Sequence, residues 1–350
     1  MIPNSLLSES IRVIILTTVA FLIALAITPI WFSFLKKHRF GKQIRNGDDT
    51  PVFQSLHKNK EGTPTGGGVI IWLTVIGMAV IFDILNHLFD GVWHYFNFID
   101  RAETYLPLTA LLGAALLGFL DDWLGVLKLG GAPGGGLKIR QKSFLYLIMA
   151  CIGAWWFYFR LGWDVLAVPF YGNVDIGWWY IPIFLFIIFA SAFSANETDG
   201  LDGLLGGVSL FAFVALTTVA FVLHRYNLAA FGGVMIGALL AFLWYNIYPA
   251  KFIMGDTGSM ALGVTIGVIA MLTNTTLLLP FFAIILVIES LSVIVQMISK
   301  KVRKKKIFRS TPIHHHFEAL GWPESQVTMR FWIISAIFSA LGLVIFFLSR

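Results

Sequence analysis

The 350-residue chain has little charge and almost no cysteine. Only 13% of its residues are charged, 57% are hydrophobic, and the mean hydropathy is +0.80. A water-soluble domain carries about 25% charged residues, so this composition excludes an ordinary soluble fold. The single cysteine, Cys151, excludes an internal disulfide and offers no thiolate metal site. The composition therefore indicates a membrane protein.

Long apolar runs recur along the whole chain. Each is about 18 or more residues long, enough to cross a hydrocarbon core roughly 30 Å thick. The first run lacks an obvious small-residue cleavage site, which predicts a retained span and not a signal peptide. We expect an all-α, polytopic membrane protein with about ten transmembrane helices and a single domain over residues 1–350. The predicted spans are 12–35, 68–89, 105–125, 143–160, 177–195, 203–223, 229–246, 258–274, 277–299 and 328–349.

Lysines and arginines are distributed unevenly between the loops. With ten spans both termini lie on one side of the membrane, and the odd-numbered loops lie on the other. Most of the 25 cationic side chains fall in the odd-numbered loops, including the run "KKVRKKK" from Lys300 to Lys306. Because cytoplasmic loops carry the excess of Lys and Arg, we expect these loops in the cytoplasm and both termini in the periplasm. The net charge of +6 is then mostly topological and does not indicate nucleic-acid binding; "KKVRKKK" could also attract a polyanionic substrate.

Five acidic residues fall on this same predicted face. Asp121 and Asp122 end the third span in "GFLDDW", Asp199 and Asp202 follow the fifth in "NETDGLDGL", and Asp256 precedes the eighth in "GDTGS". Each motif alone fits a helix cap or a turn as well as a functional site. Adjacent carboxylates at a membrane boundary repel one another unless a proton or a cation intervenes. Mg²⁺ is the usual hard cation with carboxylate and phosphate ligands, so the pattern favours metal-assisted phosphoryl transfer.

Other polar motifs are ambiguous alone. In "HKNKEGTPTGGGVI", Pro64 and three glycines indicate a tight backbone approach before the second span. Lys142 begins the fourth span, where a lysine is usually a snorkelling anchor unless nearby acids recruit it. Glu289 falls near the middle of the ninth span, where an ionisable group is usually functional or tightly paired. In "PIHHHFE", adjacent imidazoles do not converge easily on a zinc ion, which leaves substrate binding or a structural cap open.

Taken together, the motifs resemble the phospho-N-acetylmuramoyl-pentapeptide-transferase family. They occur in the order "EGTPTGGG", "GFLDDW", "NETDGLDGL", "WYNIYPAKFIMGDTGS" and "IFRSTPIHHHFEALGWPE". The resemblance covers the chain from about residue 35 to the C-terminus, and "PIHHHFE…GWPE" is its most specific element. It implies an enzyme of the bacterial inner membrane that joins UDP-N-acetylmuramoyl-pentapeptide to undecaprenyl phosphate, giving lipid I and UMP with Mg²⁺. It also implies a cytoplasmic active-site cleft and a homodimer.

The resemblance assigns roles to individual residues. Asp256 matches the magnesium-binding aspartate, Asp121 and Asp122 match the paired acids of the cleft, and Lys142 matches the lysine that follows them. The candidates for substrate binding are Asn196, Asp199, Asp202, Asn246, His314, His315, His316, Lys60 and Thr63. Two positions depart from the family pattern, which usually has leucine where this chain has Glu197 and methionine where it has Gly66. Neither departure removes a matched acid or histidine.

Two other functions stay open at this point. A sister transferase would move N-acetylglucosamine-1-phosphate from UDP-N-acetylglucosamine to the same lipid; it shares the aspartate motifs, but "PIHHHFE" favours the muramoyl-pentapeptide donor. A transporter would carry ionisable residues near mid-membrane and on both sides, commonly with internal repeats. Here Glu289 is the main mid-span acid, and the motif residues gather at one face.

Overall fold

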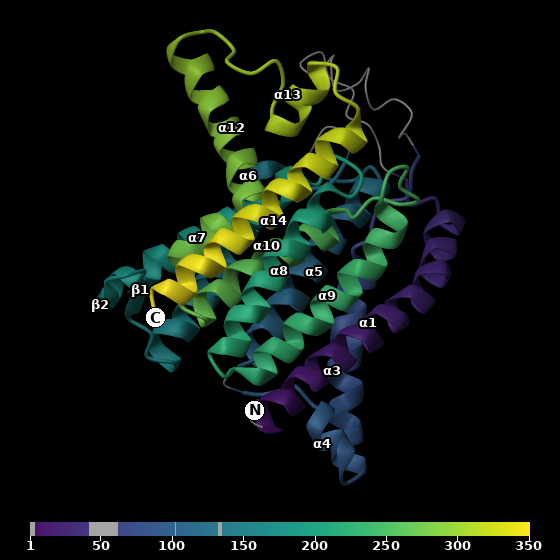
Figure 1. The fold of residues 1–350 in the computed structure, drawn as a ribbon. Helices are drawn as coiled ribbons and strands as arrows, with labels where there is room; N and C mark the ends of the chain where they lie inside the picture. The colour runs from purple at the N-terminus through teal and green to yellow at the C-terminus, as the bar shows by residue number, and fades with distance from the viewer. Residues whose placement is uncertain (1–3, 42–61, 102, 132–134) are drawn as a thin grey trace.

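The structure is a computed structural model that describes residues 4–41, 62–101, 103–131 and 135–350. Figure 1 shows a bundle of long helices. The first half contains α1 (Asn4–Lys37), α3 (Val69–Leu88), α4 (Val92–Phe96), α5 (Tyr105–Val126), α6 (Ile139–Trp155) and α7 (Tyr180–Thr198). The second half contains α8 (Leu204–Val222), α9 (Tyr226–Asn246), α10 (Asp256–Leu272), α11 (Leu279–Phe282), α12 (Ile284–Val302), α13 (Ile313–Ala319) and α14 (Glu324–Leu348).

All ten predicted spans coincide with helical structure. Within the described ranges, eight helices are long and apolar enough to cross a membrane, and α10, with 17 residues, is a shorter apolar helix. The ninth predicted span is not one straight helix, because α11 and α12 meet at Ala283 with a bend of 89°. Ala283 itself leaves the helical conformation, with φ −125° and ψ 38°. The polytopic fold is therefore confirmed, while the number of crossings stays a prediction.

The connection between the fourth and fifth spans holds extended structure. A π-helical turn (Trp156–Arg160) continues α6, and a 3₁₀ turn (Gly177–Trp179) leads into α7. Between them β1 (Val165–Val168) pairs antiparallel with β2 (Gly172–Asp175), with Val165 opposite Asp175. A second 3₁₀ turn (Thr276–Leu278) precedes α11. The hairpin is a small exception to an otherwise helical fold.

Helix α10 forms the centre of the bundle. It is buried from Thr257 to Leu272 and packs between α5 and α7. A helix that is apolar on every side has to lie inside the protein, which explains its position. The contact with α5 depends on Gly118, where an added Cβ would lie 2.2 Å from the carbonyl oxygen of Asp256. Small residues let helix backbones approach closely in membrane proteins, and here this approach places the end of α5 beside the start of α10.

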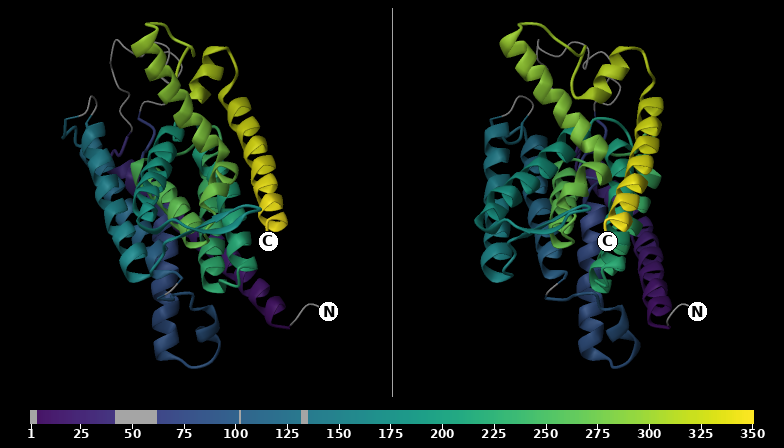
Figure 2. Two further views of the ribbon diagram at one scale, coloured as in Figure 1. Left: turned by 90° about the vertical axis from the view of Figure 1, so that its left-hand side faces the viewer. Right: turned by 60° about the vertical axis from the view of Figure 1, so that its left-hand side comes forward.

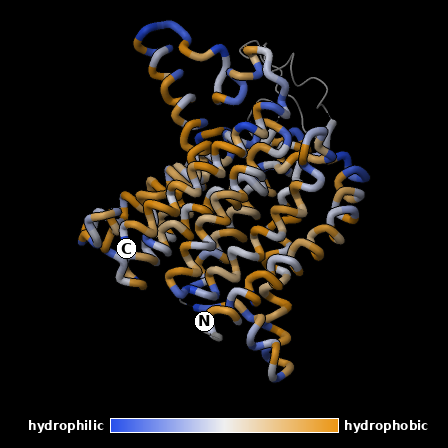
Figure 3. The backbone as a smooth tube through the Cα atoms, viewed as in Figure 1, coloured by the Kyte–Doolittle hydropathy of each residue, from blue (hydrophilic) through white to orange (hydrophobic). Residues whose placement is uncertain are grey.

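The polar motifs collect at one end of the bundle. Hydrophobic residues predominate along the long helices, and hydrophilic residues gather around the α12–α13 connection and the end of α1 (Figure 3). Both chain termini lie toward the opposite end from α13 (Figure 2). This arrangement agrees with an even number of crossings. Assignment of the α13 end to the cytoplasm rests on the loop charges and stays a prediction.

Helix α12 leaves the bundle with its polar side turned inward. The Oε1 atom of Gln296 accepts the backbone N–H groups of Ile307 and Phe308 at 2.9 and 3.1 Å, while Met297 and Ile298 are exposed. Because Gln296 holds the connection that follows α12, the chain turns back and places α13 against the bundle. This turn brings the histidine segment to the same end as the acids.

Candidate active site

Lys142 is the cation at the centre of the acidic cluster. Its Nζ lies 2.6 Å from Oδ2 of Asp121 and also contacts Oδ2 of Asp256. These side chains come from the start of α6, the end of α5 and the start of α10, and the Lys142 side chain is only 14% exposed. Two carboxylates that share one buried ammonium ion avoid direct repulsion. Lys142 is therefore recruited by the acids and is not a snorkelling anchor.

Asp122 serves a different purpose from its neighbour. Its two carboxylate oxygens accept the backbone N–H groups of Asp256 and Thr257 at 3.1 and 3.0 Å. The first N–H groups of a helix have no partner within the helix, and a negative charge there is favourable. Asp122 thus caps α10 from another helix and fixes the residue that begins it.

Asn196 and Asp199 complete the surroundings of Asp256. The Nδ2 group of Asn196 donates to Oδ1 of Asp256 at 2.8 Å and to Oγ of Ser259 at 3.2 Å. Asp199 follows α7, and its Oδ2 accepts the backbone N–H of Gly255 at 3.1 Å. The chain before α10 is therefore fixed from α7 as well as from α5, and the predicted substrate contacts of Asn196 and Asp199 stay predictions.

Asp202 and Asn246 brace the loops around the cluster. Asp202 accepts the N–H of Ala250 at 2.9 Å through Oδ2. Asn246, which is buried, accepts the N–H of Gly203 at 3.0 Å and donates to the carbonyl oxygen of Phe252 at 2.8 Å. These hydrogen bonds to backbone groups connect Asp202 and Asn246 to the shape of the site. Their predicted substrate contacts stay predictions.

The segment after the first loop lies against the lead into α10. The N–H of Ile253 donates to Pro64 at 2.8 Å, and the N–H groups of Gly67 and Gly68 donate to Ile253 and Met254, both at 2.9 Å. The expected close backbone approach is confirmed. Trp31 donates to the carbonyl of Gly66 at 3.0 Å, so the departure at Gly66 leaves this segment attached to α1. Thr63 lies in the same segment, whereas Lys60 falls outside the described residues.

The three histidines engage three different partners. His314 is buried, and its Nδ1 lies 3.0 Å from Oε2 of Glu289, which is buried as well. His315 pairs through Nδ1 with Glu318 at 2.7 Å, and the Nδ1 of His316 accepts a backbone N–H at 3.1 Å. In the part of the chain that the structure describes, no group of three or more His, Cys, Asp or Glu side chains is arranged to hold a metal ion. Glu289 is therefore tightly paired, and each histidine contacts a partner of its own.

Comparisons with known proteins identify relatives of this chain over most of its length. A family model described as Glycosyl transferase family 4 matches residues 104–274, which include the acids of α5, α7 and α10. Phospho-N-acetylmuramoyl-pentapeptide-transferase of Geobacillus thermodenitrificans is 38% identical over 337 residues, covering 95% of this chain and 97% of the relative. The enzyme of the same name from Chloroflexus aurantiacus is 36% identical over 351 residues, covering 97% and 90%.

The chain belongs to the phospho-N-acetylmuramoyl-pentapeptide-transferase family. Membership and the apolar helices together make it a multi-pass membrane phosphotransferase of bacterial type. For this family member the aspartate motifs converge on one place, although Asp122 and Asp256 are 134 positions apart in sequence.

Glu197, the departure from the family pattern, is accommodated by a serine on α12. The Oγ of Ser290 donates to Oε2 of Glu197 at 2.8 Å and also contacts Oγ of Ser194 at 2.8 Å. This link joins α7 to α12 next to Glu289. Ser290 was not among the predicted site residues. Its position, one residue after the mid-span acid Glu289, is the only signal in the sequence that could have indicated it.

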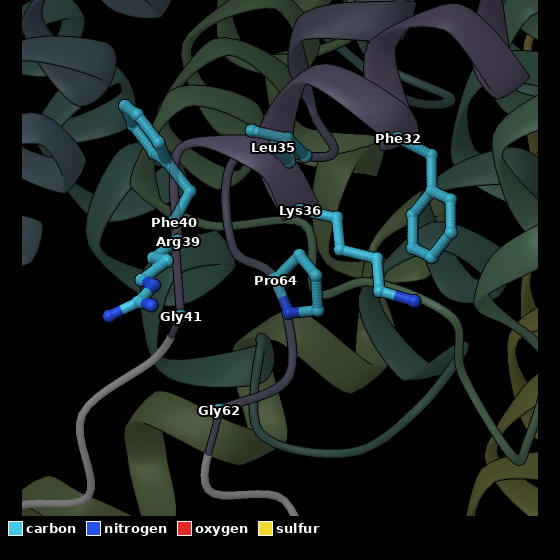
Figure 4. A pocket seen from close by; sticks show the side chains of 8 residues that line it. All are labelled: Phe32, Leu35, Lys36, Arg39, Phe40, Gly41, Gly62 and Pro64. Carbon is cyan, nitrogen blue, oxygen red and sulfur yellow. The ribbon is translucent and has the colours of Figure 1, made fainter.

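A cavity of about 360 Å³ lies near the site at the end of α1. Its apolar wall includes Phe32, Leu35, Phe40 and Pro64. Lys36 and Arg39 also line the cavity, but their charged ends point to opposite sides of Pro64 (Figure 4). Two cations that diverge do not make one anion site, and none of the clustered aspartates lines this cavity.

Proposed function

We propose that this protein transfers phospho-N-acetylmuramoyl-pentapeptide from UDP-N-acetylmuramoyl-pentapeptide to undecaprenyl phosphate, giving lipid I and UMP. The observation that carries the proposal is the ammonium group of Lys142 held between Asp121 and Asp256, in a chain whose relatives bear the name of this transferase. The names of these relatives give phospho-N-acetylmuramoyl-pentapeptide as the group transferred, which favours it over N-acetylglucosamine phosphate. This reaction would serve peptidoglycan synthesis.

The reaction brings together two strongly anionic groups. An oxygen of the lipid phosphate forms a bond to the sugar-bearing phosphorus of the nucleotide, and the bond from that phosphorus to the UMP oxygen breaks. Repulsion between the groups is severe in surroundings of low dielectric constant. Lys142 offers a fixed positive charge at the site, and electrostatic stabilisation of this kind carries most of the catalysis in phosphoryl transfer.

The donor set fits a magnesium ion. Mg²⁺ is usually bound by one or two carboxylates together with water and substrate phosphates, and here Asp121 and Asp256 converge on one cationic group. We expect Asp256 to hold the ion, with Asp121 beside it. When bound, Mg²⁺ would neutralise the pyrophosphate and stabilise the leaving UMP. Asp122 and Asn196 would keep Asp256 in place through the hydrogen bonds described above.

Asp121 would also act on the lipid phosphate in the proposed reaction. The lipid phosphate is already anionic near neutral pH, so the reaction does not require a strong base. Asp121 would take its last proton or orient the phosphate while it pairs with Lys142. Its position is fixed by the backbone N–H of Leu137, which donates to Oδ1.

Purified protein in detergent tests the proposal directly. UMP release is measured with undecaprenyl phosphate and UDP-N-acetylmuramoyl-pentapeptide, with and without MgCl₂. We expect release that requires both substrates and stops with EDTA. Release with UDP-N-acetylglucosamine in place of the muramoyl donor would assign the chain to the sister activity. Absence of turnover with either nucleotide, from protein with a cooperative thermal transition, would contradict the enzyme proposal. The family homodimer is part of the proposal and is tested by the mass of the protein in lipid nanodiscs.

A further inference from the structure

The histidine segment and the aspartate motifs meet at Gly200. This glycine lies between Asp199 and Asp202 in the loop that joins α7 to α8. An added Cβ at Gly200 would lie 2.3 Å from Nε2 and 2.9 Å from Cε1 of His314. Such distances are far below van der Waals contact, so the imidazole occupies the space that any other side chain would need. Gly200 does not have a positive φ, so its backbone alone does not require glycine.

The loop around Gly200 is attached on both sides of this contact. Before it, Asp199 accepts the N–H of Gly255, the residue next to Asp256. After it, Asp202 accepts the N–H of Ala250 at 2.9 Å and donates its own N–H to Glu324 at 2.6 Å. A shift of the loop at Gly200 would therefore move the hydrogen bond that holds the start of α10.

The side chain of His314 is buried and held in one orientation. Its side chain and that of Glu289 are both 0% exposed, and the Nδ1–Oε2 hydrogen bond of 3.0 Å sets the orientation of the ring. The backbone N–H of His314 also points to Oε2 of Glu289, at 3.5 Å. Nε2 has no hydrogen-bond partner within the described ranges and faces Gly200. A ring in this position is oriented by a carboxylate and packed against a backbone.

We infer that His314 is a positioning residue: its imidazole, oriented by Glu289, fills the space beside Gly200 and so fixes the Asp199–Asp202 loop that holds the start of α10. This inference rests on the proposed function, and it assigns His314 a different part from the substrate contact that the family resemblance implies. His315 and His316 keep their predicted substrate contacts. Through this contact, an acid in the middle of α12 would act on the aspartates at the end of the bundle.

The test compares six forms of the full-length protein in one detergent: wild type, Gly200→Ala, His314→Ala, the double variant of both, His314→Asn, and Gly77→Ala. Gly77 on α3 is a matched control, because an added Cβ there meets nothing within 4 Å. Turnover, the KM for the nucleotide and the thermal unfolding temperature are measured for each. The asparagine amide keeps a donor near the Nδ1 position and removes the ring atoms beside Gly200, which separates the contact with Glu289 from the contact with Gly200.

We expect Gly200→Ala to lower kcat roughly 10²-fold, as a misplacement of about 1 Å does at an active site, with little change in the nucleotide KM. The double variant should have the kcat of His314→Ala, because the methyl group then has room. His314→Asn should lose about as much turnover as His314→Ala, with an unchanged nucleotide KM, because it can keep the contact with Glu289 but leaves the space beside Gly200 empty. Gly77→Ala should match wild type.

Three outcomes would overturn the inference: wild-type turnover in Gly200→Ala, additive losses in the double variant, or His314→Asn as inactive as His314→Ala with a raised KM. If Gly200→Ala fails to fold, the double variant still decides, since relief of the contact has to restore folding. If wild type itself shows no turnover, the proposed function fails separately. The contact is then judged from thermal unfolding, where Gly200→Ala should destabilise only a chain that retains His314.

Discussion

The aspartate cluster draws its side chains from α5, α6, α7 and α10, whereas the histidine segment takes most of its partners from α13 and the loop before it. Lys142 reaches Asp256 across 114 positions of sequence, while His315 pairs with Glu318 within one turn of helix. In the first region two carboxylates share one ammonium ion; in the second each imidazole has its own partner. The acids therefore depend on the packing of the whole bundle, whereas the histidine segment combines local contacts with long-range ones from His314 to Glu289 and to Gly200.

The largest effect should come from Asp256→Asn. This change keeps the shape of the side chain but removes the charge that the proposed metal ion and Lys142 require, so we expect turnover to fall roughly 10³-fold. UMP release and thermal unfolding measured on the same sample give the result. Thr265→Val on the same helix is the control, since this buried hydroxyl has no partner in the described chain. Equal losses of turnover in both variants would mean that α10 tolerates no change. The loss in Asp256→Asn could then not be assigned to the missing charge.

Lys142→Met should rank second and should act on stability as well. It leaves Asp121 and Asp256 facing each other without their shared cation, which we expect to cost about 3 kcal/mol of unfolding free energy and roughly 10²-fold in turnover. Adding Asp121→Asn should restore much of the unfolding temperature, because it removes one of the two charges, but should not restore turnover. Arg140→Met, an exposed cation on the same helix, is the control. Unchanged stability in Lys142→Met would show that the acids do not need this counter-ion.

Part of the fold and of the acidic site could be predicted from the sequence. Apolar runs predicted the helices because each span has to satisfy its own backbone in lipid, and the loop charges predicted that the acids share one end. The pairing of Lys142 with Asp121 was not predictable from either pattern, because it depends on the distance between α5 and α6. The contact of His314 with Gly200 was missed because it arises from packing between segments remote in sequence. The bend at Ala283 was missed because the residues around it are apolar on both sides.

Glu289→Gln should have a smaller effect than either aspartate-cluster variant. The amide oxygen still accepts a hydrogen bond from His314, so we expect turnover to fall less than about tenfold. Glu289→Leu removes the acceptor and leaves a buried N–H without a partner, which should cost about 1–3 kcal/mol and more of the turnover. Kinetics and thermal unfolding of both variants give the order. A loss in Glu289→Gln as deep as that in Asp256→Asn would place this carboxylate in the chemistry and would remove the distinction between the two regions.

The smallest effect should come from Glu197→Leu, which installs the residue that the family pattern usually has. Glu197 is only half-buried, and its carboxyl group accepts a hydrogen bond from Ser290 on α12, away from the clustered aspartates. Removing the carboxyl group also removes the cost of partly burying it, so we expect turnover within about threefold of wild type and an unfolding free energy within about 0.5 kcal/mol. Ser290→Ala should destabilise more, by about 1 kcal/mol, because it leaves the carboxyl group without its donor.

The double variant Glu197→Leu with Ser290→Ala decides what this link does. If Ser290 serves mainly to satisfy Glu197, the serine change should cost less in the leucine background than in wild type. The residual cost would be the lost contact between Ser290 and Ser194. Additive costs in the two backgrounds would instead mean that Ser290 joins α7 to α12 independently of the acid. In that case α12 would have a second long-range contact, through Ser290, beside the contact of Glu289 with His314. The histidine segment would then depend on packing between remote helices, as the aspartate cluster does.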